Sequence, residues 1–209
     1  PQAALRRAGD VLELVHADLC GPISPPTPGG KRYFLLLVDD KSRHMWLYLL
    51  TTKDEAQPAL KRFQAMAELE SGRQLKALRT DRGGEFTSSS LGEYYADQGV
   101  KRQLTAPYTP QQNGVVERRN QTIVGMVRSL LKTKGVPARF WGEAVTTAVY
   151  LLNRSTTKSV AGSTPHEAWC GRRPNVEHLR VFGSVAHVKV TCPNLSKLDD
   201  RCTHGIPRL

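Results

Sequence analysis

Residues 33–38, with the sequence Tyr-Phe-Leu-Leu-Leu-Val, form a continuous apolar run. A strand with one wet face alternates apolar and polar residues, whereas a strand covered on both faces is apolar throughout. The run therefore predicts a central strand in a sheet that carries helices on both faces. With 209 residues, 39% of them hydrophobic, the chain can form one good-sized domain and a short appendage.

The flanking segments predict the rest of this sheet. Strands are expected over residues 11–19, 45–50, 75–80 and 100–104, and helices over 56–71 (capped by Thr52), over 90–98, after residue 114 and over 140–153. The first three strands form an antiparallel meander, and the fourth lies parallel to the first because a crossover helix precedes it. The order β-β-β-α-β-α-β-α indicates an α/β, ribonuclease H-like fold with a five-stranded mixed sheet flanked by helices.

Residues 105–114 contain two prolines, two glutamines and an Asn-Gly pair, which predict a mobile loop. In the helix expected after it, Val116, Ile123 and Val127 define the buried face. Glu117 then falls in the first helical turn and points towards the strand ends.

The chain divides into a polar leader (1–9), a core domain (10–154) and a small C-terminal extension (155–209). In the extension, Thr164 and Pro165 predict a helix start, and one or two strands are expected within 179–190. The chain begins with Pro1 rather than Met, and we interpret it as a piece of a longer polypeptide.

Three acidic residues stand out: Asp18, Asp81 and Glu117, with 35 residues between the last two. Asp18 lies in an apolar strand, where a carboxylate is costly unless a cation or hydrogen bonds compensate. Asp81 is followed by Gly83 and Gly84, which permit positive φ and a close backbone approach to a substrate. Glu117 gains modestly from the helix dipole if it lies in the first turn. Two strand-borne aspartates and one helix-borne glutamate suit Mg²⁺ ions beside a phosphodiester, because Mg²⁺ takes oxygen ligands.

Other carboxylates rank below these three. Asp39 and Asp40 close a hairpin, where Asp is common for turn reasons alone. Glu85 follows Asp81 by four residues and is read as a supporting group or a loop salt-bridge partner.

The net charge of +11 favours a polyanionic partner, because phosphates neutralised by Lys and Arg release counterions. Between residues 101 and 134 there are seven basic residues and one acid, Glu117, which predicts a DNA-facing patch around the proposed site.

The four cysteines show no zinc-finger spacing and are read as reduced thiols of an intracellular protein. No apolar run approaches the roughly 18 residues of a membrane helix, so no membrane partner is expected.

The chain resembles the integrase catalytic core of copia-type long-terminal-repeat retrotransposons, which are retroviral-integrase-like members of the ribonuclease H-like superfamily. The resemblance covers roughly residues 10–200. Its motifs are Leu14–Pro22, Tyr33–Arg43, Arg79–Phe86 and Pro107–Arg118, and in the later region Phe140–Ala144, Tyr150–Arg154 and Leu179–Gly183.

The resemblance implies a D,D(35)E catalytic and metal site at Asp18, Asp81 and Glu117. By this resemblance, Asp18 and Asp81 would share one Mg²⁺ ion, and Glu117 and Asp18 would hold a second. Mn²⁺ could replace Mg²⁺. The two ions of such sites lie ~3.5–4 Å apart. The implied activity is a DNA strand transferase and endonuclease that processes element ends and joins them to target DNA. The DNA contacts expected beside the site are Asn113, Gly114, Arg118, Arg119, Asn120, Arg128 and Lys132.

Two alternatives stay open at this point: a ribonuclease H-like nuclease that uses the same acids, and a catalytically inactive DNA-binding remnant of a degraded polyprotein. The expected partners are element and target DNA and further copies of the chain, with an intracellular, nuclear location when acting.

Overall fold

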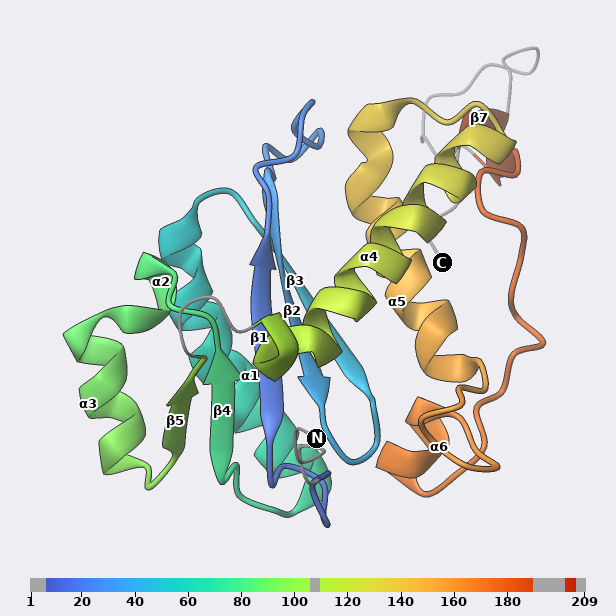
Figure 1. Cartoon of the computed structure of the whole chain (residues 1–209). Helices are drawn as coiled ribbons and strands as arrows, with labels where there is room; N and C mark the ends of the chain where they lie inside the picture. The colour runs from blue at the N-terminus through green and yellow to red at the C-terminus, as the bar shows by residue number, and fades with distance from the viewer. Residues whose placement is uncertain (1–6, 106–109, 190–201, 206–209) are drawn as a thin grey trace.

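A computed structural model describes residues 7–105, 110–189 and 202–205. Its centre is a five-stranded mixed sheet in the order β3-β2-β1-β4-β5, with helices on both faces (Figure 1). The strands are β1 (Val15–Cys20), β2 (Tyr33–Asp39), β3 (Met45–Leu50), β4 (Ala77–Thr80) and β5 (Lys101–Leu104). The helices are η1 (Lys53–Glu55), α1 (Ala56–Ser71), α2 (Gly84–Thr87), α3 (Ser89–Asp97), α4 (Pro110–Thr133), η2 (Ala138–Phe140), α5 (Trp141–Arg154) and α6 (Pro165–Cys170).

The interior strand β2 shows why the sheet is covered by helices on both faces. Successive side chains of a strand point to opposite faces. Leu35 and Leu37 therefore pack into the cluster that contains Leu60 and Phe63 of α1. The alternate residues of β2 pack into a second cluster with α4 and α5; its buried members include Phe34, Leu36, Val38, Val116, Ile123 and Val145. The apolar run is thus covered on both faces, as predicted.

The strand pairings give the ribonuclease H-like topology expected from the sequence. β1 pairs antiparallel with β2, and β2 pairs antiparallel with β3. β4 lies parallel to β1 on its other side, and β5 lies parallel to β4. The predicted strand over 11–19 begins later than expected, since Leu12 has a φ of 59° and only Val15–Cys20 pair.

Helix α1 spans the predicted residues 56–71, but the capping of the helices between residues 52 and 98 departs from expectation. Thr52 precedes η1 and makes no side-chain capping bond, and α1 begins after Glu55. Gly72 ends α1 in the left-handed conformation typical of a helix C-terminus. The short helix α2 had not been predicted, and Ser88 caps α3 by accepting a hydrogen bond from Leu91 N.

Helix α4 corrects the prediction of a mobile loop over residues 105–114. It begins at Pro110, a position where a helix tolerates proline because the missing N–H would have no intrahelical partner. Gly114 is a buried residue inside this helix. Glu117 consequently lies about two turns beyond the start, not in the first turn, and the helix-dipole argument for it is wrong. Residues 106–109 lie outside the described residues.

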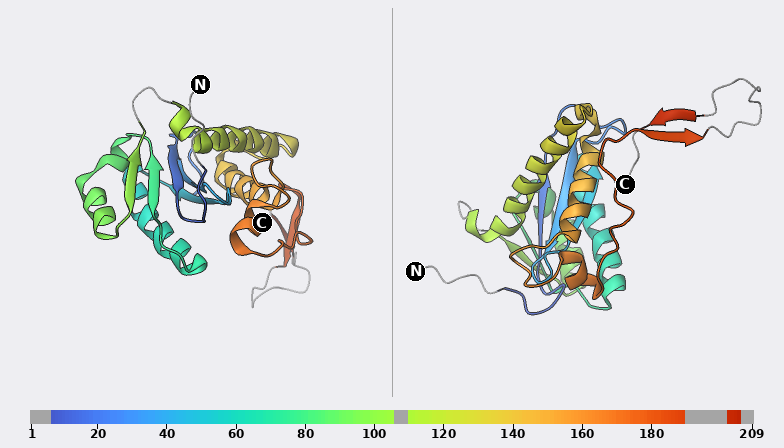
Figure 2. Two further views of the ribbon diagram at one scale, coloured as in Figure 1. Left: turned by 60° about the horizontal axis from the view of Figure 1, so that its bottom comes forward. Right: turned by 90° about the vertical axis from the view of Figure 1, so that its right-hand side faces the viewer.

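The extension begins as predicted. Thr164 Oγ1 accepts from Glu167 N at 3.1 Å, and Pro165 opens α6. The antiparallel pair β6 (Ala186–Lys189) and β7 (Cys202–Gly205) extends away from the main body (Figure 2). Within the described residues, no helix is long and apolar enough to cross a membrane.

Candidate active site

The sheet brings the two predicted aspartates to the same edge. In the parallel pairing of β1 with β4, Val15 is opposite Leu78 and His16 is opposite Arg79. Two residues further along this register, Asp18 of β1 is level with Asp81, the residue after β4. Residues level with one another on adjacent strands share a face of the sheet. Asp18 and Asp81 are therefore neighbours.

Asp18 faces helix α4. Val15 and Ala17 belong to the core cluster on the α1 face, so the alternate residue Asp18 points to the opposite face. There Asn120 of α4 donates from Nδ2 to Asp18 Oδ2 at 2.7 Å. Glu117 is three residues before Asn120 and therefore lies one turn away on a neighbouring part of the helix surface. The Asn120 hydrogen bond thus fixes the part of α4 that carries Glu117 against β1.

The surroundings of Asp18 disfavour the charged form of its carboxyl group. Its pKa is raised from 3.8 to about 6, chiefly by burial and against the lowering effect of the Asn120 hydrogen bond. The nearby charges of Asp81 and Glu117 contribute to this rise. Since a like charge acts on a pKa only at short range, the three acids share one electrostatic site.

The turn that follows β4 holds Asp81, and the side chain of Glu85 lies beside this turn. Gly83 N donates to Asp81 Oδ1 at 3.0 Å. Gly83 has a φ of −55°, so the positive φ considered for this glycine does not occur. A Cβ at Gly83 would instead lie 2.8 Å from the carboxyl carbon of Glu85, so this glycine makes room for that side chain.

The donor chemistry of the three acids fits a hard divalent cation. Carboxylate oxygens are preferred by Mg²⁺, and a bound cation would offset the repulsion that raises the pKa of Asp18. Across the described part of the chain, however, no group of three or more His, Cys, Asp or Glu side chains is arranged to hold a metal ion. The three carboxylates are near neighbours that would have to draw together around a metal.

The hairpin acids have structural roles. Asp39 is fully buried and accepts hydrogen bonds from Leu12 N at 2.9 Å and from the backbone N and Oγ of Ser42, both at 2.7 Å. Asp40 Oδ1 lies 3.0 Å from both His16 Nε2 and Arg43 Nη1. Both acids hold the turn between β2 and β3, which agrees with their low rank as candidate ligands.

The residues predicted to contact DNA lie on different sides of α4. Arg118, Arg128 and Lys132 are exposed. Arg119 is half-buried and donates to Thr157 Oγ1 at 3.2 Å. Asn120 is buried beside Asp18, and this geometry does not favour the predicted contact with a phosphate. Asn113 and Gly114 lie in the first turns of α4, and the side chain of Asn113 is outside the described part.

The partnership of Asn120 with Asp18 was missed from the sequence. The spacing from Glu117 offered a signal, because a polar residue three positions from a candidate ligand shares its side of a helix. Its partner becomes evident only when α4 is placed against β1.

The chain is similar in sequence to known proteins. Residues 10–110 match the family model of the integrase core domain. The chain is 44% identical over 200 residues to the retrovirus-related Pol polyprotein from transposon TNT 1-94 of Nicotiana tabacum, covering 96% of this chain and 15% of that protein. It is 34% identical over 191 residues to the Pol polyprotein from transposon RE2 of Arabidopsis thaliana, covering 91% of this chain and 13% of that protein.

A solved structure shows the same fold. It is the simian T-cell lymphotropic virus intasome in complex with PP2A regulatory subunit B56 gamma, which matches with a TM-score of 0.65 and 17% identity, over 99% of this chain and 71% of that chain. The architecture is thus a ribonuclease H-like fold. Within that fold, residues 10–110 match the integrase core domain family, and the chain is similar in sequence to retrotransposon Pol polyproteins.

Proposed function

We propose that the chain is the catalytic core of a copia-type retrotransposon integrase, which joins the 3′ ends of element DNA to target DNA with the help of Mg²⁺. The proposal rests on the position of the half-buried Asp18, which is level with Asp81 in the pairing of β1 with β4 and accepts a hydrogen bond from Asn120, one helical turn from Glu117. A carboxylate whose pKa is raised by burial and by neighbouring acids, beside a basic helix, is a recognisable sign of a catalytic site.

In the proposed reaction, water first attacks a phosphodiester near the element end and releases a 3′-hydroxyl. That hydroxyl loses its proton and attacks a phosphodiester of the target; a new P–O bond forms as the target 3′-oxygen leaves and gains a proton. Asp18, Asp81 and Glu117 would hold two Mg²⁺ ions, with Mn²⁺ as a substitute. When bound, such ions activate the attacking oxygen and neutralise charge on the leaving oxygen.

The other groups of the chain align the reactants. Asn120 donates to Asp18 Oδ2 and so orients this carboxyl group. Arg118, Arg128 and Lys132, exposed along α4, would bind backbone phosphates and so position DNA without reading its sequence. The proposed substrates are the element ends and the target DNA. The proposed partners are further copies of the chain, and the proposed place of action is the nucleus.

The variant Asp81→Asn tests the catalytic role apart from DNA binding. We expect loss of strand joining with unchanged affinity for a short duplex, because the amide keeps the shape of the carboxyl and removes its charge. Asp97→Asn, at the exposed end of α3, makes the same charge change and should retain both activities. Equal joining by Asp81→Asn and wild type would refute the site, and DNA binding by the wild type without nicking or joining would favour an inactive remnant.

A further inference from the structure

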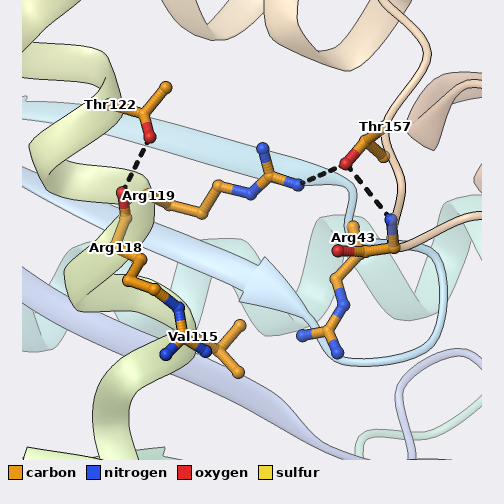
Figure 3. A pocket seen from close by; sticks show the side chains of 7 residues that line it. Arg43, Val115, Arg118, Arg119, Thr122 and Thr157 are labelled. Carbon is orange, nitrogen blue, oxygen red and sulfur yellow. Dashed lines mark hydrogen bonds between the residues drawn. The ribbon is translucent and has the colours of Figure 1, made fainter.

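A second polar site lies on the other flank of α4. It is a pocket of about 240 Å³ lined by Arg43, Val115, Arg118, Arg119, Thr122, Thr157 and Ser159. Figure 3 shows its three arginines coming from two places: Arg118 and Arg119 from α4, and Arg43 from the turn between β2 and β3. Thr157 belongs to the segment that follows α5.

The pocket holds more positive than negative charge. Arg43 pairs with Asp40 at 3.0 Å, and Asp40 is shared with His16. For Arg118 and Arg119, no carboxylate within the described ranges lies at ion-pair distance, and Arg119 has only the neutral Thr157 hydroxyl. Burial lowers the pKa of Arg119, and the positive charge of Arg43 lowers it further. Partly buried arginines that repel one another are stabilised when an anion lies between them.

Arg43 adds two independent observations. Its backbone has a φ of 62°, a conformation that glycine or asparagine adopts more readily. Its Nε is buried and has no hydrogen-bond partner among the residues that the structure describes. A buried N–H group without a hydrogen-bond partner destabilises the fold, so a ligand that supplies an acceptor oxygen here would be favoured.

The helix geometry relates this pocket to the candidate active site. Successive residues of an α-helix are 100° apart, so Glu117 and Arg119 point to opposite flanks of α4, with Arg118 between them. The helix with its side chains is about 10–12 Å across, which corresponds to about three nucleotides of a DNA strand at ~3.4 Å each. DNA that crosses the outer face of α4 would therefore meet both flanks.

We propose that this pocket binds one backbone phosphate of DNA that crosses α4, through Arg43, Arg118, Arg119 and the Thr157 hydroxyl. A phosphodiester supplies the negative charge and the acceptor oxygens that the three guanidinium groups lack. The site recognises phosphate rather than sequence, because no base edge is needed to fill it. The inference rests on the proposed function for the identity of the ligand.

The test is the salt dependence of binding to a short duplex of unrelated sequence, measured by fluorescence anisotropy. Each phosphate contact contributes about −0.9 to the slope of log affinity against log salt. We expect Arg119→Gln to lower affinity roughly five- to tenfold and to reduce the slope by about one. Arg119→Lys should recover part of the affinity. Arg62→Gln, an exposed arginine on α1 with the same charge change, should differ little from wild type.

A second variant avoids the change in charge. Thr157→Val removes the hydroxyl that holds Arg119 and should weaken DNA binding with little change in slope. Equal affinity and slope for Arg119→Gln and Arg62→Gln would overturn the proposal. Stabilisation by inorganic phosphate that depends on Arg119, with DNA affinity independent of it, would also overturn it in favour of a small-phosphate site.

Strand joining measured in parallel separates this inference from the proposed function. If the wild type joins DNA and Arg119→Gln binds DNA normally, the pocket proposal alone fails. If DNA binding depends on Arg119 but the wild type neither nicks nor joins DNA, the pocket proposal stands and the catalytic proposal fails.

Discussion

Asn120 Nδ2 donates a 2.7 Å hydrogen bond to Asp18 Oδ2 and so ties helix α4 to strand β1. The bond joins two segments that are 102 residues apart in the sequence. It lies one helical turn from Glu117, so it also fixes where that carboxylate stands relative to Asp18. In the proposed site, Asn120 is a positioning residue that acts through Asp18.

Asn120→Ala should shift the pH dependence of strand joining to higher pH. A hydrogen bond donated to a carboxylate favours its charged form, so removing it raises the already elevated pKa of Asp18. The acid limb of the rate profile in Mg²⁺ should therefore move upwards. Gln121→Ala, an exposed neighbour on α4, should leave the profile unchanged. A uniform loss of rate with an unmoved acid limb would argue against this role for Asn120.

The metal-free chain should lose stability as the pH rises because of Asp18. Its pKa is 3.8 in the unfolded chain and about 6 in the fold, so between these values the folded state binds more protons. The contribution of Asp18 to the free energy of unfolding is therefore present below about pH 4 and is lost as the pH rises through 6. Each pKa unit corresponds to about 1.4 kcal/mol, which gives a loss on the order of 2–3 kcal/mol.

Asp18→Asn isolates this contribution because an amide does not titrate. In EDTA, its free energy of unfolding in urea should rise relative to wild type by up to ~2–3 kcal/mol between pH 4 and pH 7.5. A constant difference between the two proteins across that range would show that Asp18 does not titrate as the structure indicates.

Mg²⁺ should stabilise the wild-type chain at pH 7.5. A ligand that binds only the folded state adds about 2.7 kcal/mol at one hundred times its dissociation constant. We expect a higher Tm in Mg²⁺ than in EDTA, and no such shift for Asp18→Asn or Asp81→Asn. An undiminished shift in both variants would place Mg²⁺ binding elsewhere on the chain.

Asp39→Asn should weaken the fold and leave the Mg²⁺ response intact. The buried Asp39 accepts bonds from Leu12 N and from the N and Oγ of Ser42, and an amide cannot satisfy these donors equally. The expected loss is about 2–4 kcal/mol, measured by urea unfolding. A folded Asp39→Asn protein without the Mg²⁺-induced rise in Tm would instead assign Asp39 to the metal site.

The sequence alone was sufficient to predict the five-stranded sheet. The apolar run 33–38 required a strand covered on both faces, and the observed packing of Leu35 and Leu36 into opposite clusters confirms it. The parallel pairing of β1 with β4 followed from the crossover through α1. These features depend on apolar periodicity and chain handedness, which are local or general properties.

The surroundings of α4 were harder to predict. Pro110 and Gly114 suggested a loop, but proline is compatible with a first helical turn, and the buried Gly114 shows that packing overrides its low helix propensity. The sequence offered Asn120 and Arg119 as phosphate contacts. Their hydrogen-bond partners within the chain, Asp18 and Thr157, are distant in the sequence and depend on how α4 lies on the sheet.

The most direct test of the catalytic site is strand transfer by the purified chain, with a pre-processed element-end duplex, a plasmid target and Mg²⁺. The key comparison is Glu117→Gln against Glu85→Gln, since both changes remove one carboxylate charge and Glu85 lies beside the Asp81 turn. We expect joined products with wild type and Glu85→Gln, and none with Glu117→Gln. Joining by Glu117→Gln at the wild-type rate would contradict the assignment of Asp18, Asp81 and Glu117 as the catalytic site.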